Sequence, residues 1–210
     1  PKLTGGYITK TDKIEGADVA AWSMDNYPGG QSNFVHEHPK PAEVQPEQHE
    51  YIKAEFETLQ DKVTVPSDSS IINGYPSVID LPSFVDFILL NELASNADAY
   101  EFSTFFHKDR NGKLRAGPIW DFNLTFGNDL FFWGYDRSQT DVWQFDYGGN
   151  DGPKFWRDLF DDTVFKCYLA KRWQELTASG MPLNSVEIFT LIDATTTLIS
   201  EAVERQEIIS

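Results

Sequence analysis

Two acidic residues, Asp98 and Asp121, lie in residues 88–128 and together could carry out phosphate chemistry. A carboxylate can accept the proton of an attacking hydroxyl, and carboxylate oxygens are the ligands that Mg²⁺ prefers. Two acids that meet can therefore divide phosphoryl transfer between a base and a metal ligand. Taken singly, Asp98 is explained as the cap of a turn and Asp121 as a solvated loop acid. The function depends on whether the fold brings the two together.

The residues between the two acids predict a β-hairpin. Residues 101–107 (EFSTFFH) are rich in strand formers, and residues 113–119 (KLRAGPI) form a shorter partner. Residues 109–112 (DRNG) join them, and Asn-Gly is the strongest short hairpin signal because both residues accept a positive φ. A hairpin brings its outer ends together. We therefore expect Asp98, before the first strand, and Asp121, after the second, at one end of the same sheet element.

Protein kinases place a catalytic Asp, a short hairpin and an Asp-Phe-Gly with a metal-binding Asp in this order. Here the second acid stands in residues 120–123 (WDFN), where Asn replaces the glycine. Kinases also carry a metal-binding Asn in the pattern D-x-x-x-x-N, and Ser103 occupies that position. The paired acids predict Asp98 as the catalytic base and Asp121 as the Mg²⁺ ligand. Ser103 and Asn123 are rival candidates for a second ligand.

Two more side chains are candidates for supporting roles. Asn96 is expected to hydrogen-bond Asp98 and orient it. Trp120 is expected to pack beneath the site together with Phe122, and contact with the adenine of a nucleotide is its alternative role. The helix predicted over residues 81–95 is apolar on almost every side, which is typical of a buried central helix. Such a helix would present Asp98 from a rigid support.

Residues 91–128 (NELASNADAYEFSTFFHKDRNGKLRAGPIWDFNLTFGN) closely resemble the signature of the CotH kinase family, atypical kinases named after a spore coat protein. The family pattern is an N-E-L helix end, N-x-D, a hydrophobic strand, K-D-x-x-G-K-L, then G-P-x-W-D-F-D/N and F-G-N. Weaker similarity in GGYITKTDK, HPKPAEVQPEQHEYI and FWRDLFDDTVFKCYLAKRW extends the resemblance over most of the chain. It implies transfer of the γ-phosphate of ATP to a protein hydroxyl, with Mg²⁺ as cofactor. Many members have Asp where Asn123 stands, so a second ion is expected to bind weakly or not at all.

The sequence shows no glycine-rich phosphate cradle and no strand lysine ahead of a pairing glutamate, and the resemblance places both upstream of this chain. We therefore expect an α+β fold: a kinase-like catalytic lobe with a small antiparallel sheet, a mostly helical C-terminal half, and little of the nucleotide-gripping lobe. One domain is expected over residues 1–210, with residues 1–45 as strands and linker of the small lobe, 46–128 as catalytic core and 129–210 as an aromatic loop and helical extension. Alone, such a chain is expected to bind Mg-ATP weakly and could be inactive.

Helical and strand periodicity predicts the surrounding elements. A helix beginning at Pro46 and a last helix from about residue 185 to 206 each carry an apolar stripe. His36 and His38 alternate onto one face of a short strand, but a metal site would need a third ligand that the nearby sequence does not offer. Cys167, in a predicted helix among apolar neighbours, is expected to be buried as a small hydrophobe. The predicted stripes are Ile52, Phe56, Leu59 and Val63, then Ile188, Leu191, Ile192, Thr195, Leu198, Ile199 and Ala202.

Composition narrows the classes of partner. Seventeen basic residues against 33 acidic ones give a net charge of −16, which repels nucleic acid and anionic membrane surfaces. No run is long and apolar enough to span a bilayer. By analogy with the family, we expect a bacterial protein that is exported or associated with the cell envelope.

Two other classes of function compete with phosphotransfer. One is a pseudokinase or surface-associated binding module that uses the aromatic residues 129–152, whose rings would suit a glycan. The other is metal-assisted hydrolysis of phosphate esters, which usually needs two metals and more ligands than this sequence supplies.

Overall fold

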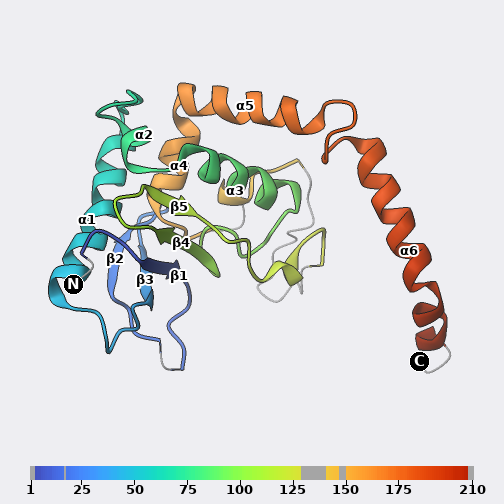
Figure 1. The fold of residues 1–210 in the computed structure, drawn as a ribbon, viewed down its shortest axis with the longest axis horizontal. Coiled ribbons are helices and arrows are strands. Elements are labelled where there is room, and N and C mark those ends of the chain that lie inside the picture. Colours follow the sequence, from blue (N-terminus) through green and yellow to red (C-terminus); the bar gives the residue numbers. More distant parts are fainter. Residues whose placement is uncertain (1–2, 17, 129–140, 147–149, 208–210) are drawn as a thin grey trace. The chain divides into compact units, whose positions relative to one another are not determined.

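The computed structural model describes residues 3–16, 18–128, 141–146 and 150–207, and its fold is α+β as expected. One antiparallel sheet has the strand order β2-β3-β1-β4-β5 (Figure 1). The strands are β1 Tyr7–Thr11, β2 Trp22–Asp25, β3 Gln31–His38, β4 Thr104–Lys108 and β5 Leu114–Ala116. The helices are α1 Pro46–Val63, α2 Tyr75–Val78, α3 Leu81–Leu93, α4 Lys154–Asp161, α5 Thr163–Thr177 and α6 Ser185–Glu207, with short 3-10 helices η1 Phe122–Leu124 and η2 Gln144–Asp146.

The predicted hairpin is present as β4 and β5, but it is shorter than expected. The amide of Gly112 donates to the carbonyl of Asp109 at 3.0 Å, and Asn111 takes the positive φ, 56°, that the Asn-Gly signal anticipates. Residues 101–103, which were predicted to belong to the first strand, form a turn instead. Ser103 has a φ of 47°, which is incompatible with an extended strand. The hairpin therefore begins at Thr104, after the turn that follows Asp98.

The N-terminal strands belong to the same sheet as the hairpin. β1 pairs with β4 from Tyr7 opposite Lys108 to Thr11 opposite Thr104, and it also pairs with β3 on its other side. The N-terminal strands and the hairpin were expected in separate parts of the chain, and β2 was not predicted from the sequence. The sheet therefore joins the start of the chain directly to the segment between the two acids.

One face of the sheet is covered by α1, α3 and α4, and Phe106 of β4 lies at the centre of this core. Phe106 is fully buried. The predicted stripe of α1 is confirmed, because its four members are the buried residues of that helix. The rings around Phe106, with centroids 5.1 to 6.4 Å from its own, are Phe34, Phe56, Phe84, Phe155 and Trp156.

Helix α3 is the predicted buried central helix. Asp80 caps it, since the carboxylate accepts a hydrogen bond from the amide of Ser83 at 3.2 Å. The helix ends at Leu93, and the turn with Asn96 and Asp98 follows it. The hydrophobic packing of α3 therefore fixes the position from which this turn begins.

The chain divides into two compact units, Pro1–Lys166 and Cys167–Ser210. In the second unit, Asn184 caps α6, because its Oδ1 accepts from the amide of Val186 at 3.1 Å. Of the apolar residues that were predicted to share one face of α6, Leu191, Leu198 and Ile199 are exposed in this structure. No helix among the described residues meets the length and apolarity needed to cross a membrane.

The prediction of a buried Cys167 is also wrong, since its thiol is exposed. Phe165 and Leu169 are buried on the same helix. Cys167 lies two residues from each of them, which turns it by roughly 200° to the other side of the helix. Apolar neighbours in sequence did not indicate a buried position because the helix separates them in space.

His36 pairs with a helix residue rather than with its neighbour on the strand. Its Nε2 lies 3.0 Å from Nδ1 of His49 on α1, and the His36 side chain is buried against Trp22. His38, at the end of β3, is exposed. The two strand histidines therefore do not share an environment, and His36 belongs to the β3–α1 contact.

Unfolding should become easier in mild acid because of His36. Burial, reinforced by the nearby His49, lowers the pKa of His36 from 6.5 to about 4. Between these values the unfolded chain binds more protons, so the contribution to stability is present above pH 6.5 and is lost as the pH falls toward 4. We expect His36→Phe to flatten this decline in urea denaturation curves measured between pH 7 and 4. His38→Gln is the matched control, and equal slopes for His36→Phe and the wild type would contradict the assignment.

Candidate active site

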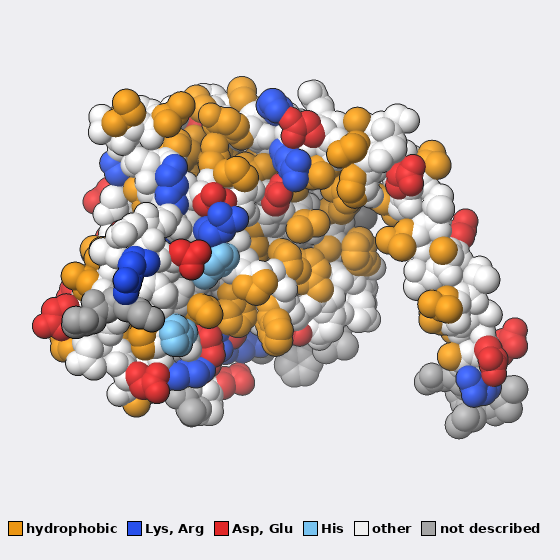
Figure 2. Space-filling model, in the orientation of Figure 1, with side chains coloured by type: hydrophobic (Ala, Val, Ile, Leu, Met, Phe, Trp, Pro, Cys, Tyr) orange, Lys and Arg blue, Asp and Glu red, His pale blue; other side chains and the backbone are white. Residues whose placement is uncertain are grey.

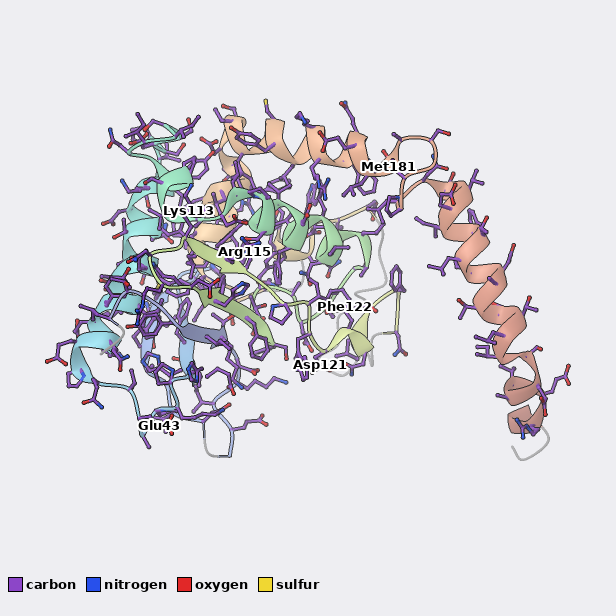
Figure 3. The ribbon with its side chains drawn as sticks, viewed as in Figure 1. Glu43, Lys113, Arg115, Asp121, Phe122 and Met181 are labelled. Carbon is purple, nitrogen blue, oxygen red and sulfur yellow. The ribbon has the colours of Figure 1, made fainter. Side chains whose placement is uncertain are left out.

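Backbone hydrogen bonds draw the segment after Asp121 against the turn that carries Asp98. The amide of Ala97 donates to the carbonyl of Leu124 at 3.2 Å, and the amide of Phe126 donates to the carbonyl of Ala94 at 2.6 Å. Figure 3 shows Asp121 and Phe122 in the chain that follows β5. These two bonds hold residues 124–126, which follow Asp121, against residues 94–97, which precede Asp98.

Asp121, Asn123 and Ser103 form a small cluster of polar side chains. Ser103 Oγ lies 3.5 Å from Asp121 Oδ2, which is long for a hydrogen bond between a hydroxyl and a carboxylate. One terminal atom of the Asn123 amide lies 2.6 Å from Asp121 Oδ1 and 3.2 Å from the Asp121 carbonyl oxygen. As nitrogen this atom donates to both oxygens. As oxygen it would converge with the carboxylate on a shared cation.

The donor set of this cluster fits Mg²⁺. Carboxylate, amide and hydroxyl oxygens are hard ligands, and Mg²⁺ typically takes one or two carboxylates and completes its shell with water and substrate phosphates. Asp121 would be the anchoring ligand, Asn123 the second and Ser103 a weaker third. No group of three or more His, Cys, Asp or Glu side chains suited to a metal occurs in the described part of the chain. A magnesium that is shared with a nucleotide does not require one.

The candidate site concentrates residues with a left-handed backbone. Six described residues other than glycine have a positive φ, and all but Asn111 of the hairpin turn lie beside the two acids. Each such position costs about 1–2 kcal/mol relative to an ordinary backbone conformation. Packing elsewhere must offset this strain, and such strain is typical of sites where geometry matters more than stability. These residues are Ser95 (φ 48°), Tyr100 (72°), Ser103 (47°), Asp121 (59°) and Phe126 (52°).

Asn96 supports the backbone of Asp98. Its side chain is buried, and Nδ2 donates to Asn91 Oδ1 at 2.8 Å. Asn96 Oδ1 accepts a hydrogen bond from the amide of Asp98 at 3.3 Å. The carbonyl of Asp98 in turn accepts from the amide of Phe102 at 2.9 Å, which closes the next turn. Asn96 therefore links the Asp98 turn to the buried end of α3.

Trp120 does not pack beneath the site with its ring buried. Its side chain is 61% exposed, and its ring lies edge-on to Phe105 of β4 with centroids 6.1 Å apart. Ile119 and Phe126 are exposed as well, and Figure 2 shows hydrophobic side chains gathered on this face of the molecule. An exposed ring directly before the candidate metal ligand is available to stack on a planar ligand.

A half-buried carboxylate that contacts the residues after Asp98 was not predicted from the sequence. Glu92 of α3 accepts a hydrogen bond from the Tyr100 hydroxyl at 2.7 Å and from the amide of Gln144 at 2.8 Å. Burial raises the pKa of Glu92 to about 7, although hydrogen bonds from Tyr100 and from the amides of Gln144 and Phe145 act in the opposite direction. The available signal was an acid within a helix that is apolar on almost every side.

The family model described as "CotH kinase protein" matches residues 2–209. The match covers nearly the whole chain, and the chain therefore belongs to the CotH kinase family. Membership associates it with kinase-like activity and with ATP and Mg²⁺ as the corresponding cofactors. No curated protein matched the chain. No solved structure matched it either.

Ser103 offers a direct measure of the backbone strain at the site. At a φ of 47°, glycine is unstrained, whereas alanine retains the steric cost of a side chain. We expect Ser103→Gly to be more stable than Ser103→Ala by about 1 kcal/mol in chemical denaturation. Both variants lack the hydroxyl near Asp121, so the comparison isolates the backbone term. If the alanine variant were equally stable, the left-handed conformation of Ser103 would not be a source of strain.

Proposed function

We propose that this chain carries the catalytic residues of a phosphotransferase that moves the γ-phosphate of ATP to a protein hydroxyl. Asp98 is the base that orients the acceptor hydroxyl and takes its proton late in the transfer. Asp121 holds Mg²⁺, with Asn123 and Ser103 completing the protein's share of ligands. The observation that supports the proposal is the oxygen cluster around Asp121, in a segment whose backbone is hydrogen-bonded to the residues that precede Asp98.

The division of roles follows from the surroundings of each acid. Asp121 is exposed, with Ser103 and Asn123 beside its carboxylate, and this suits an ion that is shared with phosphates. Asp98 lies on a turn that is fixed by Asn96 and by the end of α3. A loose transition state needs an acceptor that is held in line more than it needs a strong base, so rigid placement of an ordinary carboxylate is sufficient. When bound, Mg²⁺ would neutralise charge on the phosphates.

Trp120 is proposed to contact the adenine of the nucleotide. The exposed ring is adjacent in sequence to the metal ligand, and Phe105 supports one edge of it. Stacking of an aromatic ring on a base is tolerant of the identity of the base and is worth about 1–3 kcal/mol. By family analogy, we further propose a bacterial protein that acts in the cell envelope or outside the cell.

The runner-up is a non-catalytic binding module. Ser103 stands where ordinary kinases have an asparagine ligand, and its 3.5 Å contact with Asp121 is weak. The aromatic segment proposed for glycan binding, residues 129–152, falls largely outside the described residues. Two measurements on the chain separate this module from the kinase.

Metal-dependent nucleotide binding is the first of these measurements. We expect Mg-ATP to raise the melting temperature of the chain, and Asp121→Ala to abolish the shift because the remaining oxygens are too few to hold the ion. Asp193→Ala, an exposed acid on α6, is the matched control and should retain the shift. Titration with Mn²⁺ followed by its paramagnetic relaxation reports the metal alone. Equal Mn²⁺ affinity in wild type and Asp121→Ala would rule out this ligand assignment.

Transfer of labelled γ-phosphate to a polypeptide is the second. We expect Asp98→Asn to reduce transfer by about two to four orders of magnitude, the range over which general-base groups act. The same variant should still bind Mg-ATP, because Asp98 is assigned to the acceptor and not to the metal. Release of free phosphate without labelled protein would indicate a hydrolase. Nucleotide binding without either product would favour the binding module.

A further inference from the structure

Tyr100 anchors the Asp98 turn from the side of the core. Its side chain is 1% exposed, although its backbone has a φ of 72°. The ring contacts Phe87, Phe145 and Trp156 at centroid distances of 6.2, 6.2 and 5.2 Å. A buried tyrosine needs a partner for its hydroxyl. The partner of the Tyr100 hydroxyl is the carboxylate of Glu92, the penultimate residue of α3.

Glu92 binds two segments that are distant in sequence. One carboxylate oxygen accepts the Tyr100 hydroxyl at 2.7 Å, and the other accepts the amide of Gln144 at 2.8 Å. Gln144 begins η2, whose Phe145 ring packs on Tyr100 and on Phe160 of α4. The carboxylate thus ties α3, the Asp98 turn and η2 into one hydrogen-bonded unit.

The same turn is held at a second point by residues 150–152. Asn150 Nδ2 donates to the carbonyl of Ala99 at 2.7 Å. A Cβ atom added to Gly152 would lie 2.8 Å from Tyr100 Cβ and 3.0 Å from the Tyr100 carbonyl carbon, which is closer than packed atoms approach. The segment can lie this close to Tyr100 only because Gly152 lacks a side chain.

We propose that Glu92 is a positioning residue for phosphoryl transfer, acting through the Tyr100 hydroxyl to hold the Asp98 turn in its left-handed conformation. The inference rests on the proposed function for its catalytic consequence, but its structural part stands alone. The strain at Tyr100 and Ser103 would be relieved if the turn relaxed. The Tyr100–Glu92 hydrogen bond opposes that relaxation and so holds the turn that carries Asp98.

A solely space-filling role for Glu92 predicts different behaviour. If the side chain only filled the core, its substitutions would lower stability throughout the unit. Hydrogen exchange would then quicken as much in α1 as in the turn. A positioning role predicts a local effect on residues 99–103 and a selective loss of turnover. The test therefore measures hydrogen exchange at the turn and measures phosphoryl transfer separately.

Two variants remove the bond from either side, Glu92→Leu and Tyr100→Phe. Glu57→Leu on α1 and Tyr168→Phe on α5 repeat the same chemical changes at exposed positions. Amide hydrogen exchange should quicken by about tenfold at residues 99–103 in both test variants and remain unchanged in α1. Neither control should alter exchange at the turn. Unchanged exchange at residues 99–103, or uniform acceleration across the unit, overturns the inference.

Steady-state transfer of labelled phosphate then tests the catalytic consequence. We expect kcat to fall about tenfold in each test variant, with the KM for ATP changed less than twofold, because nucleotide binding depends on Asp121. The double variant should be no slower than the Glu92 variant alone, since Tyr100→Phe removes only a bond that the Glu92 variant already lacks. A rise in KM with unchanged kcat overturns the positioning role. Full transfer activity in Asp98→Asn would instead overturn the proposed function, and hydrogen exchange would still decide whether Glu92 holds the turn.

Discussion

The candidate site depends on the backbone hydrogen bonds that close a loop between Asp98 and Asp121. β4 and β5 form an antiparallel pair, and two backbone hydrogen bonds, Ala97 to Leu124 and Phe126 to Ala94, fasten the segments that flank the pair. Because these bonds use backbone atoms, they fix position without depending on which side chains are present. The side chains at the closed end are therefore free to serve chemistry, and the cluster at Asp121 is placed there.

Such closure has an energetic cost that the core must offset. Five left-handed residues beside the acids would together favour a relaxed loop by several kcal/mol. Opposing them are the buried ring of Tyr100 and the aromatic core around Phe106, each held from several directions. Burial of a large ring contributes about 1.5–3 kcal/mol, so a few anchored rings are enough to keep the strained turn in place. Packing of the core against the sheet therefore stabilises the strained geometry of the site.

Local signals in the sequence predicted local structure well. The stripe of α1 and the Asn-Gly turn each depend on residues within a few positions of one another, and both are present. What the sequence could not supply was pairing between distant segments: nothing in Tyr7–Thr11 indicates that β1 lies beside β4. For the same reason, the roles of Glu92 and Asn150 were missed, since their partners Tyr100, Gln144 and Ala99 become neighbours only in the folded chain.

The distribution of charge explains why a metal is the appropriate source of positive charge at this site. Three cations of the sheet are already engaged: Lys10 lies between Asp12 and Asp18, Lys108 is buried and donates to the carbonyl of Gly112, and Arg115 pairs with Asp80. Lys13 holds its ammonium 4.7 Å from the centre of the Phe102 ring. A chain with a net charge of −16 would repel a nucleotide polyphosphate unless charge arrived with the ligand. Mg²⁺ bound to the phosphates brings that charge, and an exposed aspartate with an amide beside it is then attractive rather than repulsive. Under the proposed function, the acidity of the site would favour binding of a metal–nucleotide complex over binding of the free nucleotide.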